Sequence, residues 1–216
     1  MTDRLLRGSA VSPGMAVGPA VVVRWAMPEV PHRIVSPPQV AREVRRLRAA
    51  VRDVKRHLAE LKERVEDRAG VDEARIFDAQ MLMLEDDDFL GGIEDLIREN
   101  HLTAEKAFEF KALEVRDAWA GTGSPLLADR LVDLTGVTIR VVHHLMRRGI
   151  DDLWGGIEAR SIVVAKELTP GLTVQLDREH VIGLVSEQAD ALDAFERALT
   201  TTYAWAGLVV ALAPLD

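Results

Sequence analysis

The sequence predicts an α/β (α+β) fold in two parts, an α/β domain made from both ends of the chain and a helical bundle inserted between them. Short apolar, β-branched runs typical of strands occur near the N-terminus and again after residue 160. The long stretch between them carries apolar residues at helical spacing instead. We therefore expect the α/β domain at residues 1–32 plus 152–216, and a four-helix-type bundle of helical hairpins at residues 33–151.

Three segments are predicted to be strands. Residues 12–23 form a turn followed by a continuous apolar run, the pattern of a strand buried on both faces. Residues 162–165 form a second run, which the turn Thr169-Pro170-Gly171 ends. Residues 181–185 form a third run. We expect these strands to share one sheet.

Residues 38–70 are predicted to form one long amphipathic helix. Its apolar positions alternate steps of four and three, with charged residues at most of the others: Val40, Val44, Leu47, Val51, Val54, Leu58, Leu61 and Val65. Gly70 would end this helix. A coiled-coil seam has the same pattern, so pairing with a second chain stays open as an alternative.

Further helices follow in the middle of the chain. Asp72 is the expected N-cap of a helix whose apolar face is Ile76, Phe77, Met81 and Leu84. After the acidic corner at residues 85–88, a shorter helix should run to about Asn100. Thr103, with Glu105 close behind, is the expected cap of the next helix, which carries Phe108 and Val115. The break at residues 121–125 precedes a last helix over residues 126–148, closed by Arg147, Arg148 and Gly149.

Composition limits the classes of function. A net charge of −8 and a pI near 5.3 argue against nucleic-acid binding and favour a basic partner. The absence of cysteine excludes disulfides and zinc-thiolate sites, and is compatible with a reducing compartment. No apolar run approaches ~18 residues and no cleavable signal precedes Ser12, so we expect a cytoplasmic protein without membrane insertion.

Three motifs in this order carry a family resemblance: residues 12–20 (SPGMAVGPA), 73–86 (EARIFDAQMLMLED) and 163–173 (VVAKELTPGLT). From about Gly8 to Ser186 the chain resembles the N-terminal half of enzyme I, the phosphoenolpyruvate-protein phosphotransferase of the bacterial sugar phosphotransferase system. The resemblance implies a swivelling phosphohistidine domain that holds an inserted helical bundle, and a bundle that docks the small phosphocarrier protein HPr.

The resemblance also implies a chemistry that this chain has lost. In the family, a histidine takes the phosphoryl group from phosphoenolpyruvate and passes it to HPr, a task that suits a neutral imidazole. That position falls on Ala194, no histidine follows His180, and Thr173 falls where the family supports the phosphohistidine loop. The barrel that binds phosphoenolpyruvate and magnesium, and that forms the dimer, would follow beyond Asp216. We therefore expect no catalytic residue, metal, cofactor or dimerisation domain in this chain.

The remaining histidines suggest no replacement nucleophile. We interpret His180 as an exposed surface residue, and His143 and His144 as surface or partly buried structural residues, because no carboxylate cluster at ligand spacing accompanies them.

The family's HPr contacts fall on residues that the chain largely keeps. Position by position, the resemblance assigns them to Ile76, Gln80, Leu82, Met83, Asp87, Asp88, Phe89, Leu127 and Arg130. Gln80 stands where the family generally has histidine. An apolar centre with an acidic rim suits a basic carrier. The alternatives are that Ile76, Met81 and Leu84 are core residues and that residues 86–88 are a solvated helix end.

We therefore expect an HPr-docking fragment or homologue of enzyme I that is inactive in phosphotransfer. The alternative is a non-catalytic interaction module, either a pseudoenzyme or a self-associating bundle. The resemblance ends abruptly after Ser186, which is typical of a frameshift, while truncation and true divergence stay open as alternatives. Residues 200–216 show no clear amphipathic period, so we expect this tail to pack poorly.

Overall fold

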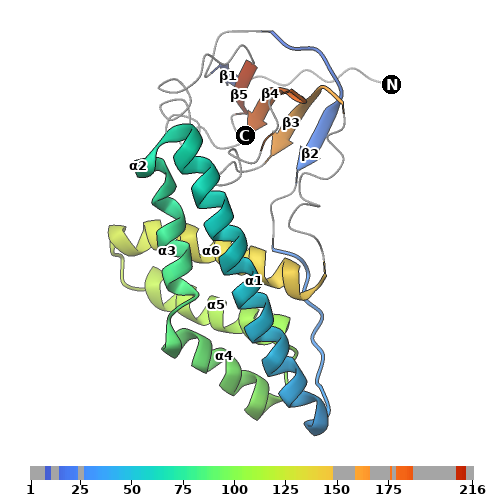
Figure 1. The fold of residues 1–216 in the computed structure, drawn as a ribbon, viewed down its shortest axis with the longest axis vertical. Coiled ribbons are helices and arrows are strands. Elements are labelled where there is room, and N and C mark those ends of the chain that lie inside the picture. Colours follow the sequence, from blue (N-terminus) through green and yellow to red (C-terminus); the bar gives the residue numbers. More distant parts are fainter. Residues whose placement is uncertain are drawn as a thin grey trace. The chain divides into compact units, whose positions relative to one another are not determined.

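The computed structural model describes residues 8–10, 15–23, 27–147, 159–165, 176, 179–186 and 208–212. The chain divides into two compact units. The helical unit comprises Ala26–Arg64 and Ala74–Ile150, and the sheet unit comprises Met1–Trp25, Val65–Glu73 and Asp151–Asp216. Figure 1 shows the strands in one unit and most of the helices in the other.

The three predicted strands are confirmed as one parallel array in the sheet unit. β3 (Ser161–Ala165) lies between β2 (Ala20–Val23) and β4 (Val181–Ser186), with Val163 opposite both Val21 and Leu184. Val163 and Leu184 are fully buried. Gly18, just before β2, allows this close pairing, because a Cβ there would lie 2.8 Å from Ile182 Cδ1 and 3.2 Å from the Arg160 carbonyl oxygen.

Two further strands complete the sheet, and one of them corrects the expectation for the tail. β1 (Gly8–Ala10) and β5 (Leu208–Leu212) give the order β1-β5-β4-β3-β2. β5 is parallel to β4 and antiparallel to β1. The expectation that residues 200–216 pack poorly is therefore wrong for residues 208–212. Their sequence LVVAL is a continuous apolar run that suits an interior strand, the same kind of signal that predicted β2 and β3.

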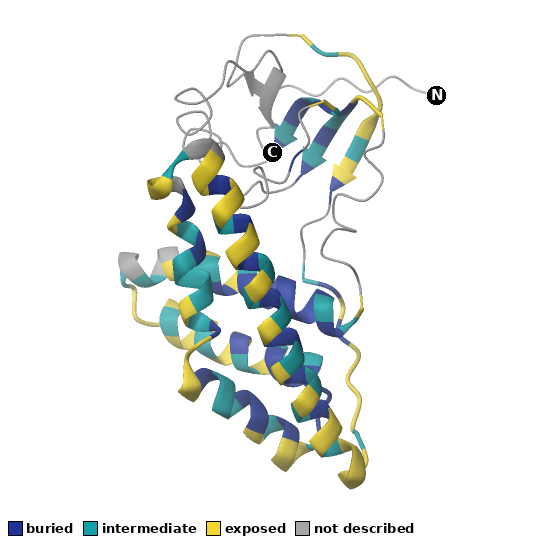
Figure 2. Ribbon diagram, viewed as in Figure 1, coloured by how far each residue is buried: buried dark blue, intermediate teal, exposed yellow. Residues whose placement is uncertain are grey.

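The long helix α1 (Pro37–Ala69) confirms the predicted amphipathic pattern. Its seam is buried throughout from Leu47 to Val65, with Val54 and Leu58 fully inaccessible, and Figure 2 shows buried and exposed positions alternating along the helix. Gly70, with φ 114°, ends the helix as predicted.

The turn after α1 corrects the prediction for Asp72. The chain resumes a helix immediately, as α2 (Val71–Ala74), and continues into α3 (Ile76–Met83). Asp72 therefore lies inside the first turn of α2 and not at an N-cap, because no extended residue separates Gly70 from the next helix. The apolar face of α3 is partly confirmed: Phe77 and Leu84 are buried, whereas Ile76 and Met81 are half-buried.

The next helices are α4 (Asp87–Asn100), α5 (Ala104–Ala120) and α6 (Pro125–Leu145), which follow the predicted order. Asp86 caps α4 by accepting a hydrogen bond from Phe89 N at 2.8 Å. Thr103 stands at the N-cap position of α5, but its side chain makes no capping hydrogen bond. α6 ends three residues before the predicted Arg148, since Arg147 has left the helix with φ 55°. No helix of the described residues is both long and apolar enough to cross a membrane.

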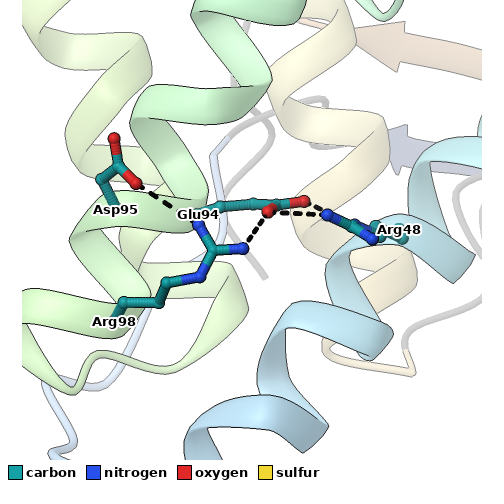
Figure 3. Close-up of polar contacts among 4 residues, drawn as sticks. All are labelled: Arg48, Glu94, Asp95 and Arg98. Carbon is teal, nitrogen blue, oxygen red and sulfur yellow. Dashed lines mark hydrogen bonds and ion pairs between the residues drawn. The ribbon is translucent and has the colours of Figure 1, made fainter.

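A charged cluster links α4 to α1. Arg48 donates to the Glu94 carboxylate through Nε at 2.6 Å and through Nη2 at 2.9 Å, and Arg98 pairs with the same carboxylate (Figure 3). Arg98 also pairs with Asp95 at 3.3 Å. Glu94 is 9% exposed. The hydrogen bonds from Arg48, with a further contribution from Arg98, hold the pKa of Glu94 below its ordinary value, although burial opposes that shift.

Candidate functional site

A pocket of about 290 Å³ opens in the helical unit where four helices meet. The residues that line it come from the end of α3, the corner between α3 and α4, and the helices α4, α5 and α6: Met83, Asp86, Asp88, Phe89, Lys111, Val115, Trp119 and Leu134. Its size is at the lower end of the range for small-ligand sites, and it also suits one or two side chains of a partner.

The apolar part of the pocket rests on the core of the bundle. Phe89 is 9% exposed and packs edge-on against Phe108, with ring centroids 5.5 Å apart and an interplanar angle of 89°. Leu134 from α6 is buried as well, whereas Val115 and Trp119 are half-buried. Edge-to-face packing fixes the ring of Phe89. The pocket therefore has a rigid floor and a partly exposed aromatic wall.

Acidic residues gather at the corner that leads into α4. Asp86 caps the helix, while Asp87 and Asp88 lie in its first turn, and all three are exposed. The positive end of the α4 macrodipole stabilises carboxylates at this position. Asp86 and Asp88 line the pocket, so the corner supplies an acidic rim beside the apolar floor.

Lys111 supplies a cation to the same pocket. Its stem crosses α4 at Gly92, where a Cβ would lie 2.8 Å from Lys111 Cε and 3.1 Å from Nζ. Its ammonium pairs with Glu114 at 3.2 Å, and its side chain is 21% exposed. Glycine at position 92 therefore permits the close approach of Lys111 to α4.

The structure brings some of the sequence-predicted residues together at this pocket. Met83, Asp88 and Phe89 line it, and Asp87 is the neighbour of Asp88 in the first turn of α4. Leu82 is not among the lining residues of the described chain, but its side chain is 63% exposed. Phe89 forms the floor of the pocket and has little exposed surface. It therefore shapes the pocket and offers little contact area to a partner.

The other predicted residues lie along α3 and α6, away from the pocket lining. Ile76 and Gln80 are half-buried on α3, and Gln80 packs toward α6, with Nε2 3.6 Å from the position of a Cβ on Gly136. The Gln80 Oε1 atom is buried with no hydrogen-bond partner in the described part of the chain. On α6, Leu127 is half-buried and Arg130 pairs with Asp133 at 3.6 Å. The docking role assigned to these residues stays a prediction.

Sequence reasoning missed the wall that α5 contributes. Lys111, Val115 and Trp119 follow one another at intervals of four residues, so they share one face of the helix. This spacing was a usable signal. A helix face that only packs against the core carries apolar residues throughout. This face carries a lysine and a tryptophan beside an apolar residue, so it differs from a core face.

None of the described histidines lines the pocket. His143 is buried, and His144 Nε2 lies 3.4 Å from Asp53 Oδ2. Arg140 is 2% exposed, and burial lowers its pKa to about 10. Within the described ranges no three His, Asp or Glu side chains gather as a metal site. Thr173 and Ala194 lie outside the described residues.

Comparisons with known proteins identify the family. A family model described as PEP-utilising enzyme, N-terminal, matches residues 7–130, so the chain belongs to that family. It is 30% identical over 185 residues to the phosphoenolpyruvate-protein phosphotransferase of Geobacillus stearothermophilus, covering 86% of this chain and 32% of that protein. The protein of the same name in Listeria monocytogenes is 31% identical over 186 residues, covering 84% of this chain and 31% of that protein. The resemblance predicted from the three motifs is confirmed.

Solved structures confirm the predicted fold class. An NMR solution structure of Enzyme I (nEIt) superposes with a TM-score of 0.76 at 22% identity, covering 95% of this chain and 81% of that one. The N-terminal domain of Enzyme 1 - Nitrogen superposes with a TM-score of 0.65 at 20% identity, covering 96% and 83%. The chain spans about a third of the length of the curated relatives that it matches.

Proposed function

We propose that the helical unit docks an HPr-like phosphocarrier, and that the pocket formed by α3, α4, α5 and α6 receives an apolar side chain of that carrier. The observation that carries the proposal is the combination of a half-buried aromatic wall at Trp119 with exposed Asp87 and Asp88 at the start of α4. Desolvated apolar anchors supply affinity, while charges at the rim steer a basic partner into place. The same proposal implies a role in sugar transport and a cytoplasmic location.

NMR tests this docking face directly. Purified HPr is titrated into the ¹⁵N-labelled chain, and the amide shifts are mapped onto the helices. We expect the largest shifts at Met83, Asp87 and Asp88 and at the Trp119 indole, with smaller shifts over the rest of α3. A flat titration at millimolar HPr would falsify the docking proposal, and shifts confined to the sheet unit would move the site elsewhere.

We propose further that the chain accepts no phosphoryl group. The support is in the sequence, where the family's histidine position falls on Ala194 and no histidine follows His180. An alanine side chain has no lone pair with which to attack phosphorus. A reverse assay isolates this step from phosphoenolpyruvate binding: phospho-HPr labelled with ³²P is mixed with the chain. We expect no label on the chain, with an intact enzyme I as the positive control. Transfer above the no-protein background refutes the proposal.

Self-association through α1 has less support than docking. The α1 seam that suggested a coiled coil is already buried within this chain, from Leu47 to Val65. A second chain that approached α1 would therefore contact its charged positions and not its apolar seam. Analytical ultracentrifugation alongside the HPr titration separates the two functions, because docking predicts a monomer that binds HPr.

A further inference from the structure

Lys111 is the one cation among the described residues that line the pocket, which otherwise presents apolar side chains and the carboxylates of Asp86 and Asp88. Its side chain is 21% exposed, and Glu114, its ion-pair partner on α5, is 65% exposed. A pair with one solvated member contributes little to stability. The ammonium can therefore exchange Glu114 for another acid at small cost.

Gly92 leaves the room that this ammonium occupies. A Cβ on Gly92 would lie 2.8 Å from Lys111 Cε, 3.1 Å from Nζ and 3.4 Å from Cδ, so any side chain at residue 92 would displace the end of the lysine. The adjacent Gly91 is different, because a Cβ there would meet nothing within 4 Å. The glycine at position 92 thus admits the lysine end, whereas the glycine at position 91 does not contact it.

The charges follow a fixed order along α4. Asp86 caps the helix, Asp88 lies in its first turn, and Lys111 crosses the helix at Gly92, four residues beyond Asp88. Four residues correspond to a rise of about 6 Å along a helix. A partner that matches this surface carries a basic group opposite the α4 N-terminus and an acidic group about one turn farther on.

We propose that Lys111, positioned by Gly92, is a specificity-determining residue of the pocket, and that it selects a carrier with an acidic side chain beside the apolar group that enters the pocket. The proposal rests on the proposed docking function. It adds that the carrier has a negatively charged side chain next to the apolar side chain that enters the pocket. Docking removes water from around Lys111. An ion pair between Lys111 and an acid of the carrier is therefore stronger than the pair between Lys111 and the solvated Glu114. A carrier with a lysine at that place is repelled.

Small probes test the charge preference without any carrier. The probes are 3-phenylpropionate, its neutral analogue 3-phenylpropanol and its cationic analogue 3-phenylpropylamine, and the readout is the Trp119 indole N–H signal, assigned with W119F. We expect the wild-type chain to bind the carboxylate about threefold more tightly than the alcohol, the size of one partly exposed ion pair. In Lys111→Met that ratio should fall to about one or below, because Asp86 and Asp88 still line the pocket. In Gly92→Ala, which displaces the flexible end of the lysine but keeps its charge, the ratio should fall part of the way.

Gly91→Ala is the matched control, because it makes the same change one residue away on α4 without meeting Lys111. It should keep the threefold preference for the carboxylate. Like Gly92→Ala, it raises the helix propensity of α4, so the two variants share that effect. An equal affinity for carboxylate and alcohol in the wild type overturns the proposal, and so does the failure of every probe to move the Trp119 signal. A carboxylate preference without HPr binding refutes only the docking function. HPr binding without a carboxylate preference refutes only the role of Lys111.

Discussion

Glu43 on α1 accepts a hydrogen bond from the backbone N–H of Ala104, the first residue of α5, at 3.0 Å across 61 positions of sequence. The same carboxylate, 6% exposed, pairs with Arg46, whose Nη2 donates to the Leu145 carbonyl oxygen at the end of α6 at 2.9 Å. One turn of α1 therefore satisfies a donor at the start of α5 and an acceptor at the end of α6.

Glu43→Ala should lower the free energy of unfolding of the helical unit by about 2 kcal/mol, because it leaves a buried N–H and the Arg46 guanidinium without this carboxylate. Urea unfolding followed by far-UV circular dichroism measures the loss. Glu60→Ala, an exposed position on the same helix, is the control and should change little. Equal losses in the two variants would contradict a specific contribution of the Glu43 carboxylate.

The Arg48–Glu94 cluster predicts an acid-sensitive contribution to stability. The pKa of Glu94 is lower in the folded chain than its unfolded value of about 4.3, so its contribution is complete above that pH and is lost as the pH falls through the folded value. The stability gap between wild type and Glu94→Gln should therefore be largest near neutral pH and close in acid. Urea titrations over that range measure it. Asp95→Asn, at a side chain that is 64% exposed, should leave the wild-type profile unchanged.

Trp119 should be an anchor of the docking surface. Trp119→Ala removes the aromatic wall of the pocket, and we expect it to weaken HPr binding by at least about tenfold, as measured by calorimetry. Leu113→Ala changes a 37% exposed residue of the same helix that does not line the pocket, and should bind normally. If both variants bind like the wild type, the apolar anchor lies elsewhere on the bundle.

The acidic corner should control the rate of docking more than its strength. Replacing Asp87 and Asp88 together by Lys should slow association with HPr by about tenfold through reversed steering, with a smaller change in dissociation. Stopped-flow measurements at two salt concentrations test this, since added salt should shrink the difference. The control replaces Asp95 and Glu99, exposed residues toward the other end of α4, by Lys. A change in dissociation alone contradicts the steering role.

β5 should be essential to the sheet. Val210 pairs with Ala10 on one side and Val185 on the other, so Val210→Pro removes a donor from the interior of the sheet. We expect the amides of β4 to lose hydrogen-exchange protection while those of α1, α4 and α5 keep it. Val210→Ala should have a milder effect. Rapid exchange of residues 208–212 in the wild-type chain would instead support the loosely packed tail expected from the sequence.

Local patterns allowed some of this fold to be predicted and not the rest. α1 was predictable because the seam from Leu47 to Val65 repeats over many turns, and β2, β3 and β4 because their apolar runs end at clear turns. β1 is only three residues long, which is too short for a pattern to show. β5 is a continuous apolar run like β2, so its sequence did carry a usable signal. The cap of α5 was not predictable, since Thr103 has the sequence of a cap while the buried carboxylate that does the capping comes from Glu43.

The candidate site shows the same limit. The acidic corner and Met83 could be assigned by resemblance, because they lie in the motif of residues 73–86 or directly after it. The contribution of α5 depends on how α4 and α5 pack, which the sequence does not specify locally. Gly92 looks equivalent to Gly91 in the sequence, and only the packing of Lys111 distinguishes them.

The strand order has a consequence for synthesis on the ribosome. β1 is the first strand to be made, yet the strand it pairs with in the described chain is β5, the last. α4 with α5 and α5 with α6 are contacts between neighbours in sequence, which form quickly in a nascent chain. The helical unit can therefore reach its final packing before β5 is made, while the backbone of β1 is still unpaired. During translation the unpaired strand edge therefore belongs to the sheet unit.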